Sequence, residues 1–297
     1  MRGVTKVCLL MLLLTMLRPL MADSVKSLIT PTVFKQGLIW QISKDQQQST
    51  IIGTMHVDHP GVWRLYKQAE KSFSAAMTVC TEVKMDFATA AAEIKALFFT
   101  DGRTLKSVLN DKVLYKRALE LAEKRGLPEI MVRNMKPFTL VFMLNTPIPE
   151  GQVLDEKIFT DALLQGKEVC ALETTDEHGR VFNAFTMDMQ IGILRETLAN
   201  IDKVDAMYPL LIKAYVERDL VAIVDLVNDS MFVADARIEE IFINKFLLER
   251  NIKMVERMLP VLKKGKGFFA VGAMHLVGKG GILRLLQQQG YEISVVY

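Results

Sequence analysis

What the sequence lacks narrows the range of functions before any motif is considered. Its 297 residues include only three cysteines and four histidines, and 37 basic residues stand against 34 acidic ones. Arg2, Lys6 and Arg18 lie in the first 22 positions, so the rest of the chain is balanced in charge. Nucleic-acid binding normally needs a basic face, so we expect no nucleic-acid partner. Charges also interrupt every apolar run after the N-terminal segment, and none of these runs is typical of a membrane span.

The first 22 residues are typical of a secretory signal peptide. Met1–Lys6 is short and basic, and Val7–Leu17 is almost wholly apolar but too short to cross a bilayer comfortably. Cleavage after Ala22 would release a chain without a stable membrane span, either periplasmic or secreted. An uncleaved N-terminal anchor is the alternative. Cys8 lies at the start of the apolar run and not at the cleavage point, so the segment does not indicate a lipoprotein.

Two cysteines, Cys80 and Cys170, remain after that cleavage, each inside an expected buried strand. Export permits a disulfide between them. A disulfide needs Cα atoms within about 7 Å of each other, and nothing in the sequence brings these strands together. We therefore expect two small buried hydrophobic side chains, with the disulfide as the open alternative.

Strand patterns gather at the two ends of the chain, with one between them, and helical patterns fill the gaps. A helix beginning at Pro60 joins the second strand to the third, which predicts a parallel crossover. Asn110 is the expected N-cap of a helix from Lys112 to Arg125, and breaks are expected near Pro209 and at 228–230. The expected strands are Val33–Ile42, Thr50–His56, Met77–Val83, Lys167–Glu173, Gly267–Ala273 and Tyr291–Val296.

These elements predict an α/β fold. It has a mixed central sheet built from two strand–turn–helix repeats, with large helical insertions at about 86–165 and 188–264. A chain of this length can bury its core as one or two domains, and we expect residues 23–297 to form a single α/β domain.

One short pattern occurs twice, once near each end of the chain. An apolar strand runs into Gly53-Thr54-Met55-His56, and another runs into Gly272-Ala273-Met274-His275. Glycine permits a sharp turn after the strand and removes bulk beside the imidazole. Two of the four histidines are therefore expected to occupy equivalent places in two copies of one unit.

Four expected strands end in side chains that can do chemistry: His56, Glu82, Glu173 and His275. Open α/β sheets bind their ligands at the carboxyl ends of the strands. Two imidazoles with one or two carboxylates suit Zn²⁺, Mn²⁺, Co²⁺ or Fe²⁺. Such a metal activates water and polarises a carbonyl, and a second carboxylate would serve as general base or orient a ligand histidine.

Each of these residues also has a structural interpretation. A histidine at a strand end is commonly a hydrogen-bonded structural residue, although the repeated motif favours a functional one. Glu82 and Glu173 could instead form buried ion pairs with Arg133 or Arg250.

The other histidines and the methionines of the motifs are weaker candidates. His59 lies in a polar loop and is expected to be solvated, and His178 lies near an expected helix start or loop. Met55 and Met274 are expected to pack rather than to bind a metal.

An ordered set of short motifs extends over the mature chain and resembles the TraB/GumN family, which includes the Tiki proteins. A single Gly-x-x-His has no value as a signature, but the ordered set is specific. The motifs are Gly37–Trp40, Thr50–His56, the strand ending in Glu82, Lys136–Phe138, Leu154–Asp155, Leu172–Thr174, Glu249–Asn251 with Met254, and Val271–Leu276 with Gly278, Gly281, Gly290 and Tyr291.

The resemblance implies an exported metal-dependent hydrolase, with peptide cleavage known for the Tiki branch. It implies a divalent metal (Mn, Co or Zn) held by His56, His275 and Glu82. Glu82, Glu173 and Arg250 are the implied catalytic residues, with Glu173 and Arg250 completing or bracing the site. The substrate would be a peptide or another small molecule.

Related folds include erythromycin esterases and a haem-binding lipoprotein. A non-catalytic module that sequesters a peptide, haem or a signalling molecule is therefore the alternative function. A purely structural envelope protein is a third and weaker interpretation.

Overall fold

The structure is a computed structural model that describes residues 25–84, 86–146, 151–230 and 235–297. The expected signal peptide lies outside the described residues. The strands are β1 (Ile39–Lys44), β2 (Gln47–Thr54), β3 (Thr78–Thr81), β4 (Glu168–Ala171), β5 (Gly267–Gly272) and β6 (Glu292–Val295). The α-helices are α2 (Pro60–Ala75), α3 (Phe87–Leu97), α4 (Leu105–Leu109), α5 (Lys112–Lys124), α6 (Glu129–Val132), α7 (Pro137–Asn145), α8 (Leu154–Leu164), α9 (Thr175–Val181), α10 (Met187–Ala199), α11 (Ile201–Val216), α12 (Leu220–Ser230), α13 (Ala236–Ile241), α14 (Glu249–Lys264) and α15 (Ile282–Gln288). A π-helix, η1 (Phe242–Leu248), precedes α14, and a 3₁₀ turn, η2 (Ala273–His275), follows β5.

The six strands form one sheet in the order β4-β3-β5-β2-β1-β6. Strands β4, β3, β5 and β2 are parallel, whereas β1 runs antiparallel to both of its neighbours. The mixed sheet with helical insertions confirms the predicted α/β fold. Because four neighbouring strands run the same way, their carboxyl ends meet at one edge of the sheet.

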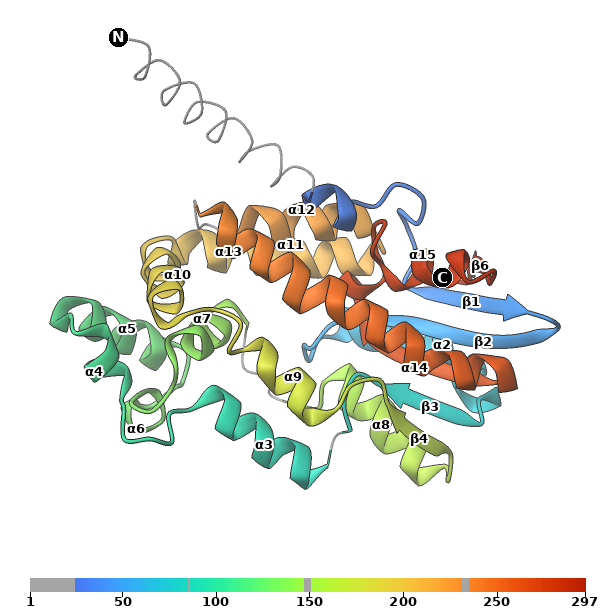
Figure 1. Ribbon diagram of the computed structural model, residues 1–297, viewed down its shortest axis with the longest axis horizontal. Helices are drawn as coiled ribbons and strands as arrows, with labels where there is room; N and C mark the ends of the chain where they lie inside the picture. Colours follow the sequence, from blue (N-terminus) through green and yellow to red (C-terminus); the bar gives the residue numbers. More distant parts are fainter. Residues whose placement is uncertain (1–24, 85, 147–150, 231–234) are drawn as a thin grey trace, which may run out of the picture.

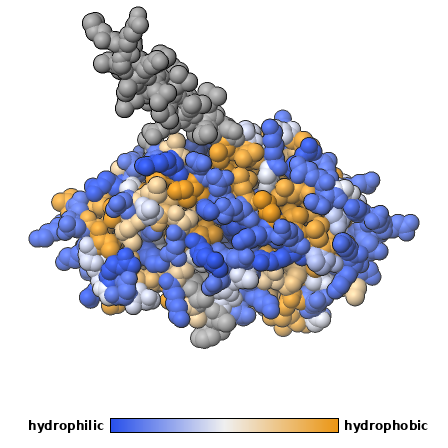
Figure 2. Space-filling model, viewed as in Figure 1, coloured by the Kyte–Doolittle hydropathy of each residue, from blue (hydrophilic) through white to orange (hydrophobic). Residues whose placement is uncertain are grey.

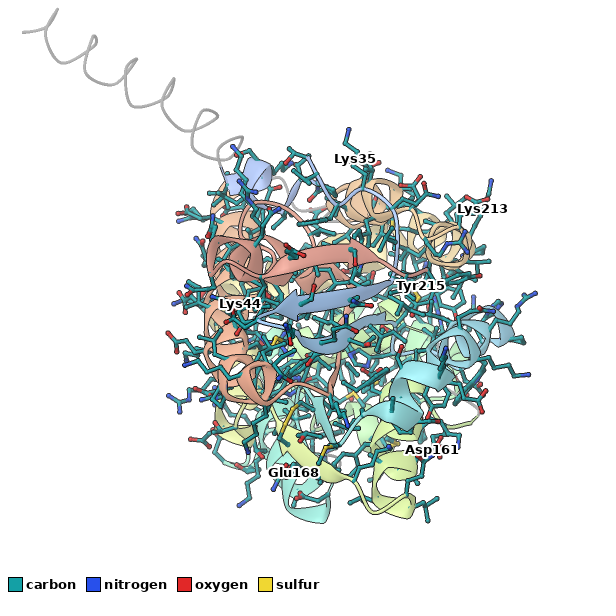
Figure 3. The ribbon with its side chains drawn as sticks, turned by 90° about the vertical axis from the view of Figure 1, so that its right-hand side faces the viewer. Lys35, Lys44, Asp161, Glu168, Lys213 and Tyr215 are labelled. Carbon is teal, nitrogen blue, oxygen red and sulfur yellow. A yellow bond between two sulfur atoms is a disulfide. The ribbon has the colours of Figure 1, made fainter. Side chains whose placement is uncertain are left out.

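Helices cover both faces of the sheet. Phe73 of α2 packs edge-on against Phe268 of β5, with ring centroids 5.3 Å apart. On the opposite face α14 lies so close that a Cβ atom added to Gly267 would be 2.8 Å from Val261. Figure 1 shows α14 crossing in front of the strands, with α2 behind them. Figure 3, turned by 90°, shows Tyr215 beside the central strands, and its hydroxyl donates a 2.7 Å hydrogen bond to the Gly53 carbonyl.

The helical insertions build a second hydrophobic cluster beside the sheet. Its members come from α4 to α7, from α10 and α11, and from α13, with aromatic contacts centred on Phe138. Helix α8 belongs instead to the core around the sheet, where Leu154 and Ile158 are fully buried. That the whole is a single domain stays a prediction. Among the described residues no helix is both long and apolar enough to cross a bilayer.

Three local expectations were wrong. Asp111, and not Asn110, is the N-cap of α5, because Asn110 takes the left-handed conformation that ends α4. Pro209 lies inside α11 without ending it. The strands also end earlier than predicted: β2 stops at Thr54, two residues before His56, and β3 stops at Thr81.

Cys80 and Cys170 form a disulfide, which the sequence left as the less favoured alternative. The two cysteines are register partners in the parallel pair β3–β4, and their Cα atoms are 4.5 Å apart. The expectation of unbridged cysteines failed because the chain places β4 directly beside β3 after 90 residues of mostly helical insertion.

Candidate active site

All four predicted strand-end residues lie at one edge of the sheet. Glu82 and Glu173 follow the neighbouring strands β3 and β4, and His56 and His275 follow the neighbouring strands β2 and β5. The backbone pairing continues beyond the last strand residues, because the Glu173 N–H donates to the Glu82 carbonyl at 2.7 Å. The four side chains therefore lie at the carboxyl ends of the parallel strands, where open α/β sheets bind their ligands, and their roles stay predictions.

Arg250 bridges the two carboxylates. Its Nη2 atom lies 2.6 Å from Oε2 of Glu82 and 2.5 Å from Oε2 of Glu173, and its Nε atom lies 2.9 Å from Oε1 of Glu173. All three side chains are buried or nearly so. The sequence left Arg133 and Arg250 open as partners. Arg250 is the partner, and Arg133 is exposed.

Glu82 remains a charged carboxylate despite its burial. Burial opposes ionisation, but His275, Arg250 and His56 hold the pKa of Glu82 well below its ordinary value, and the Gly272 N–H helps. That N–H donates to Oε1 of Glu82 at 2.6 Å. A Cβ atom at position 272 would lie 3.3 Å from the same oxygen, so glycine lets the backbone approach the carboxylate closely.

His275 is buried and held at one nitrogen. Its Nδ1 atom lies 2.6 Å from the amide oxygen of Asn251, and its Nε2 atom lies 3.8 Å from Oε1 of Glu82. Burial lowers the pKa of His275 to about 3, so the ring is neutral near pH 7. A neutral ring that donates from Nδ1 to Asn251 leaves the lone pair of Nε2 directed toward Glu82.

His56 is held by a different kind of partner. Its Nδ1 atom lies 2.9 Å from Oδ2 of Asp155, and its side chain is 53% exposed. Asp155 is buried, and its other oxygen accepts a 2.6 Å hydrogen bond from the Thr54 hydroxyl. The Asp155 charge raises the pKa of His56 to about 9. His56 therefore carries a proton near pH 7, unlike His275.

The two Gly-x-x-His copies are not equivalent, contrary to the sequence prediction. Gly53 pairs with Val271 and Thr54 pairs with Gly272, so the copies are displaced by one residue in the sheet. Neither glycine has a positive φ angle, so their role is close packing and not a left-handed turn. A Cβ atom at Gly53 would lie 3.2 Å from the Cα atom of Ala273, where one copy packs against the other.

The weaker candidates, namely the other two histidines and the two motif methionines, make local structural contacts. His59 is the N-cap of α2, where its Nδ1 atom accepts a hydrogen bond from the Gly61 N–H, so it is not merely solvated. His178 lies within α9 and its ring meets Phe182 edge-on. Met55 and Met274 pack against the main core, as expected.

Sequence reasoning did not assign roles to Asp155, Asn251 and Thr54. Asp155 and Asn251 were noticed only as parts of longer motifs. Asp155 lies on α8, far along the chain from His56, and Asn251 lies on α14, 24 residues before His275. Asn251 directly follows Arg250, so one turn of α14 supplies partners for Glu82, Glu173 and His275. The one signal for Asn251 in the sequence was its position directly after Arg250, a residue already assigned to the site.

The donor atoms suit a divalent metal. The 3.8 Å between Nε2 of His275 and Oε1 of Glu82 is shorter than the roughly 4.2 Å that two zinc–ligand bonds span end to end, so one ion can touch both atoms. In both histidines Nδ1 faces an oxygen acceptor, which is the arrangement of metal-binding histidines in general. Among the described residues, no three His, Cys, Asp or Glu side chains are already grouped around one point. His56 therefore stays a predicted third ligand, and the assigned catalytic roles stay predictions.

Comparisons with known proteins find relatives that match most of this chain. The chain is 24% identical to "Metalloprotease TIKI2" of Xenopus tropicalis over 87% of its length and 59% of the relative's. It is 23% identical to "Metalloprotease TIKI homolog" of Nematostella vectensis over 90% of its length and 68% of the relative's. For "Metalloprotease TIKI1" of Danio rerio the identity is 24% over 89% of this chain and 64% of the relative. The chain thus spans about six tenths of the length of these relatives. No solved structure matches.

A family model matches most of the described chain. The sequence model of the TraB/PrgY/gumN family matches residues 38–295, a range that includes the sheet, both insertions and every residue of the site. This chain is a member of the TraB/PrgY/gumN family.

Proposed function

We propose that this protein is a metal-dependent hydrolase that cleaves peptides. The observation that carries the proposal is the buried pair of Glu82 and His275, in which an ionised oxygen and an imidazole lone pair face each other at 3.8 Å. Two acceptors that face each other in a buried site favour a cation between them. The metalloprotease names of the similar proteins support the same reaction class.

We assign each residue of the site a role in this proposal. His275 and Glu82 would hold the metal, with His56 as the third ligand once its proton is released. A metal bound there supplies activated water and polarisation of the scissile carbonyl. Asn251 keeps the His275 lone pair at Nε2, and Asp155 orients His56. Arg250 offsets the charge of the two carboxylates and keeps Glu173 in place.

Metal content and affinity of the purified protein test the proposal. We expect stoichiometric divalent metal in the wild type and loss of it in His275→Ala and Glu82→Gln. His59→Asn is the matched control, because asparagine replaces the N-cap of α2 outside the site. Folding of each variant is checked by circular dichroism. Equal metal binding in the wild type and in folded His275→Ala would refute the site.

Digestion of unrelated unfolded polypeptides by the metal-loaded protein tests the reaction. Cleavage that stops with a chelator and returns with added metal is expected. A protein that binds metal but leaves every peptide bond intact would favour the alternative function, sequestration of a ligand.

We also propose that the protein is exported. The N-terminal segment has the pattern of a signal peptide, and the Cys80–Cys170 disulfide is of a kind that persists in oxidising compartments. N-terminal sequencing of protein from the cell envelope or the medium should begin at Asp23. A chain that begins at Met1 and stays with the cytosol would contradict export.

A further inference from the structure

A cleft of about 340 Å³ opens beside the candidate site, between α9 and the continuous helix of η1 and α14. Glu173 and Arg250 form part of its lining, so the cleft begins at the site itself. Val181 and Ala184 add an apolar part to its wall. Figure 1 shows α9 and α14 on the same face of the molecule, and Figure 2 shows hydrophilic side chains across this part of that face.

The acidic residues in the depth of the cleft are already held by arginines. Glu173 has bidentate contact with Arg250. Glu177 has bidentate contact with Arg257, at 2.7 and 3.2 Å, and its carboxylate also accepts from the Thr174 N–H in a capping box. These bonds tie the two walls of the cleft together.

The basic residues at the mouth are held only weakly. Arg180 pairs with exposed Asp176, Lys245 pairs with Glu249, and Lys253 is a third partner of Glu177 at 3.3 Å. The basic side chains are 49% to 72% exposed. Exposed pairs of this kind contribute about 0–1 kcal/mol, so a ligand carboxylate can replace the present partner at little cost.

The lining of the cleft carries four basic side chains, Arg180, Lys245, Arg250 and Lys253, against three acidic ones, Glu173, Glu177 and Glu249. Of the charged lining side chains that have no bidentate arginine partner, Arg180, Lys245 and Lys253 are cationic and Glu249 is anionic. The volume of the cleft is at the small end for binding pockets, which fits a short extended segment and not a folded domain.

We propose that this cleft binds an acidic segment of a peptide, with Arg180, Lys245 and Lys253 contacting its carboxylates, and thereby selects the substrate. The inference rests on the proposed peptidase function, because the cleft ends at the Arg250–Glu173 pair of that site. At that end Arg250 lines the cleft, and its Nη2 atom lies 2.6 Å from Oε2 of Glu82.

Binding of two labelled peptides tests this inference without any need for cleavage. One fluorescein-labelled peptide alternates glutamate with glycine, and the other has glutamine in place of each glutamate. Fluorescence anisotropy in the presence of a chelator should give at least tenfold tighter binding of the glutamate peptide. Equal affinity for the two peptides would overturn the proposal.

Two charge-reversal variants locate the binding. Lys245→Glu/Lys253→Glu alters the mouth of the cleft, whereas Lys263→Glu/Lys264→Glu makes the same change of net charge at the exposed far end of α14. The first variant should weaken binding of the glutamate peptide at least tenfold and the second less than threefold. Equal loss in both would show general charge attraction and refute the cleft. Arg180→Glu is the second cleft variant, used if the double variant has an altered thermal transition.

The binding and cleavage experiments together distinguish failure of this inference from failure of the proposed function. If the protein binds the glutamate peptide in the cleft but never cleaves a peptide, only the hydrolase proposal fails. If it cleaves glutamate and glutamine peptides equally well, the hydrolase proposal stands and the acidic preference is wrong.

Discussion

The Nδ1 atom of His275 lies 2.6 Å from the amide oxygen of Asn251, and both side chains are buried. The Asn251 amide group also donates to the Gly280 carbonyl at 2.8 Å, so its orientation is fixed. Burial keeps the His275 ring uncharged, and the Asn251 oxygen at Nδ1 leaves the Nε2 lone pair available.

Asn251→Leu tests this relationship. Leucine fills the space but removes the acceptor for Nδ1, so we expect metal affinity to fall roughly 10- to 100-fold, the usual effect of losing an outer-shell partner. Isothermal titration with a divalent metal measures it, and Asn200→Leu on the surface is the control. Unchanged affinity in a folded Asn251→Leu protein would contradict the assigned role.

Metal binding should depend steeply on pH because of His56. Its raised pKa, about 9, means that a proton must leave before the ring can bind a metal. Affinity should therefore rise by up to about tenfold per pH unit as the pH approaches 9. In Asp155→Asn the increase should level off near pH 6.5, the ordinary histidine value. The same pH profile in both proteins would exclude His56 as a ligand.

The His56–Asp155 pair should also stabilise the metal-free fold in a limited pH range. The pKa of His56 is higher in the folded state, about 9, than in the unfolded state, near 6.5. The pair therefore stabilises the fold fully below pH 6.5, and this contribution is lost as the pH rises through about 9. Because His56 is half exposed, we expect no more than about 1 kcal/mol. Urea unfolding of wild type and Asp155→Asn at pH 6 and pH 9 measures the difference, which should shrink at the higher pH.

Removing Arg250 should be costly at neutral pH. Arg250→Met leaves the buried carboxylates of Glu82 and Glu173 without their shared cation, and breaking a buried pair in this way costs about 3–5 kcal/mol. The pKa of Glu82 is lowered in the fold, so its contribution is present above the ordinary pKa and lost as the pH falls. The deficit should thus shrink in acid. Arg257→Met, which breaks a partly exposed pair, should cost less.

The disulfide should contribute substantially to stability. Cys80→Ser/Cys170→Ser removes a bridge between residues 90 positions apart, and losing a native disulfide typically costs about 2–5 kcal/mol. Thermal unfolding with and without dithiothreitol measures it. Reductant should lower the transition of the wild type to that of the double variant and leave the variant itself unchanged. A reductant-insensitive wild type would show that the bridge adds nothing.

The sequence predicted which side chains meet at this edge of the sheet because strand ends can be read from a linear pattern. Strand-like stretches that lead into His56, Glu82, Glu173 and His275 mark the strands, and the parallel pairing of these strands brings their ends together. Even Arg250 could be named, as one of two possible partners. These inferences need only local periodicity and one rule of topology.

What the sequence did not reveal depends on packing between distant elements. Asp155 on α8 and Asn251 on α14 reach the histidines only after helices have docked on the sheet, and no local pattern encodes that docking. The repeated Gly-x-x-His suggested symmetry, but the copies are displaced by one residue and their histidines differ in surroundings, so His56 is protonated near pH 7 whereas His275 is neutral. The disulfide was missed for the same reason, since the order of β3 and β4 is a tertiary property.

The bridge between Cys80 and Cys170 also makes the first helical insertion a closed covalent loop that contains α3 to α8. A single cut by a protease anywhere in that loop leaves the two pieces joined through β3 and β4. The nicked protein would still migrate as one chain on a non-reducing gel and would keep Glu82 and Glu173 side by side. Processing within the insertion could thus reshape the surroundings of the site without releasing either carboxylate strand.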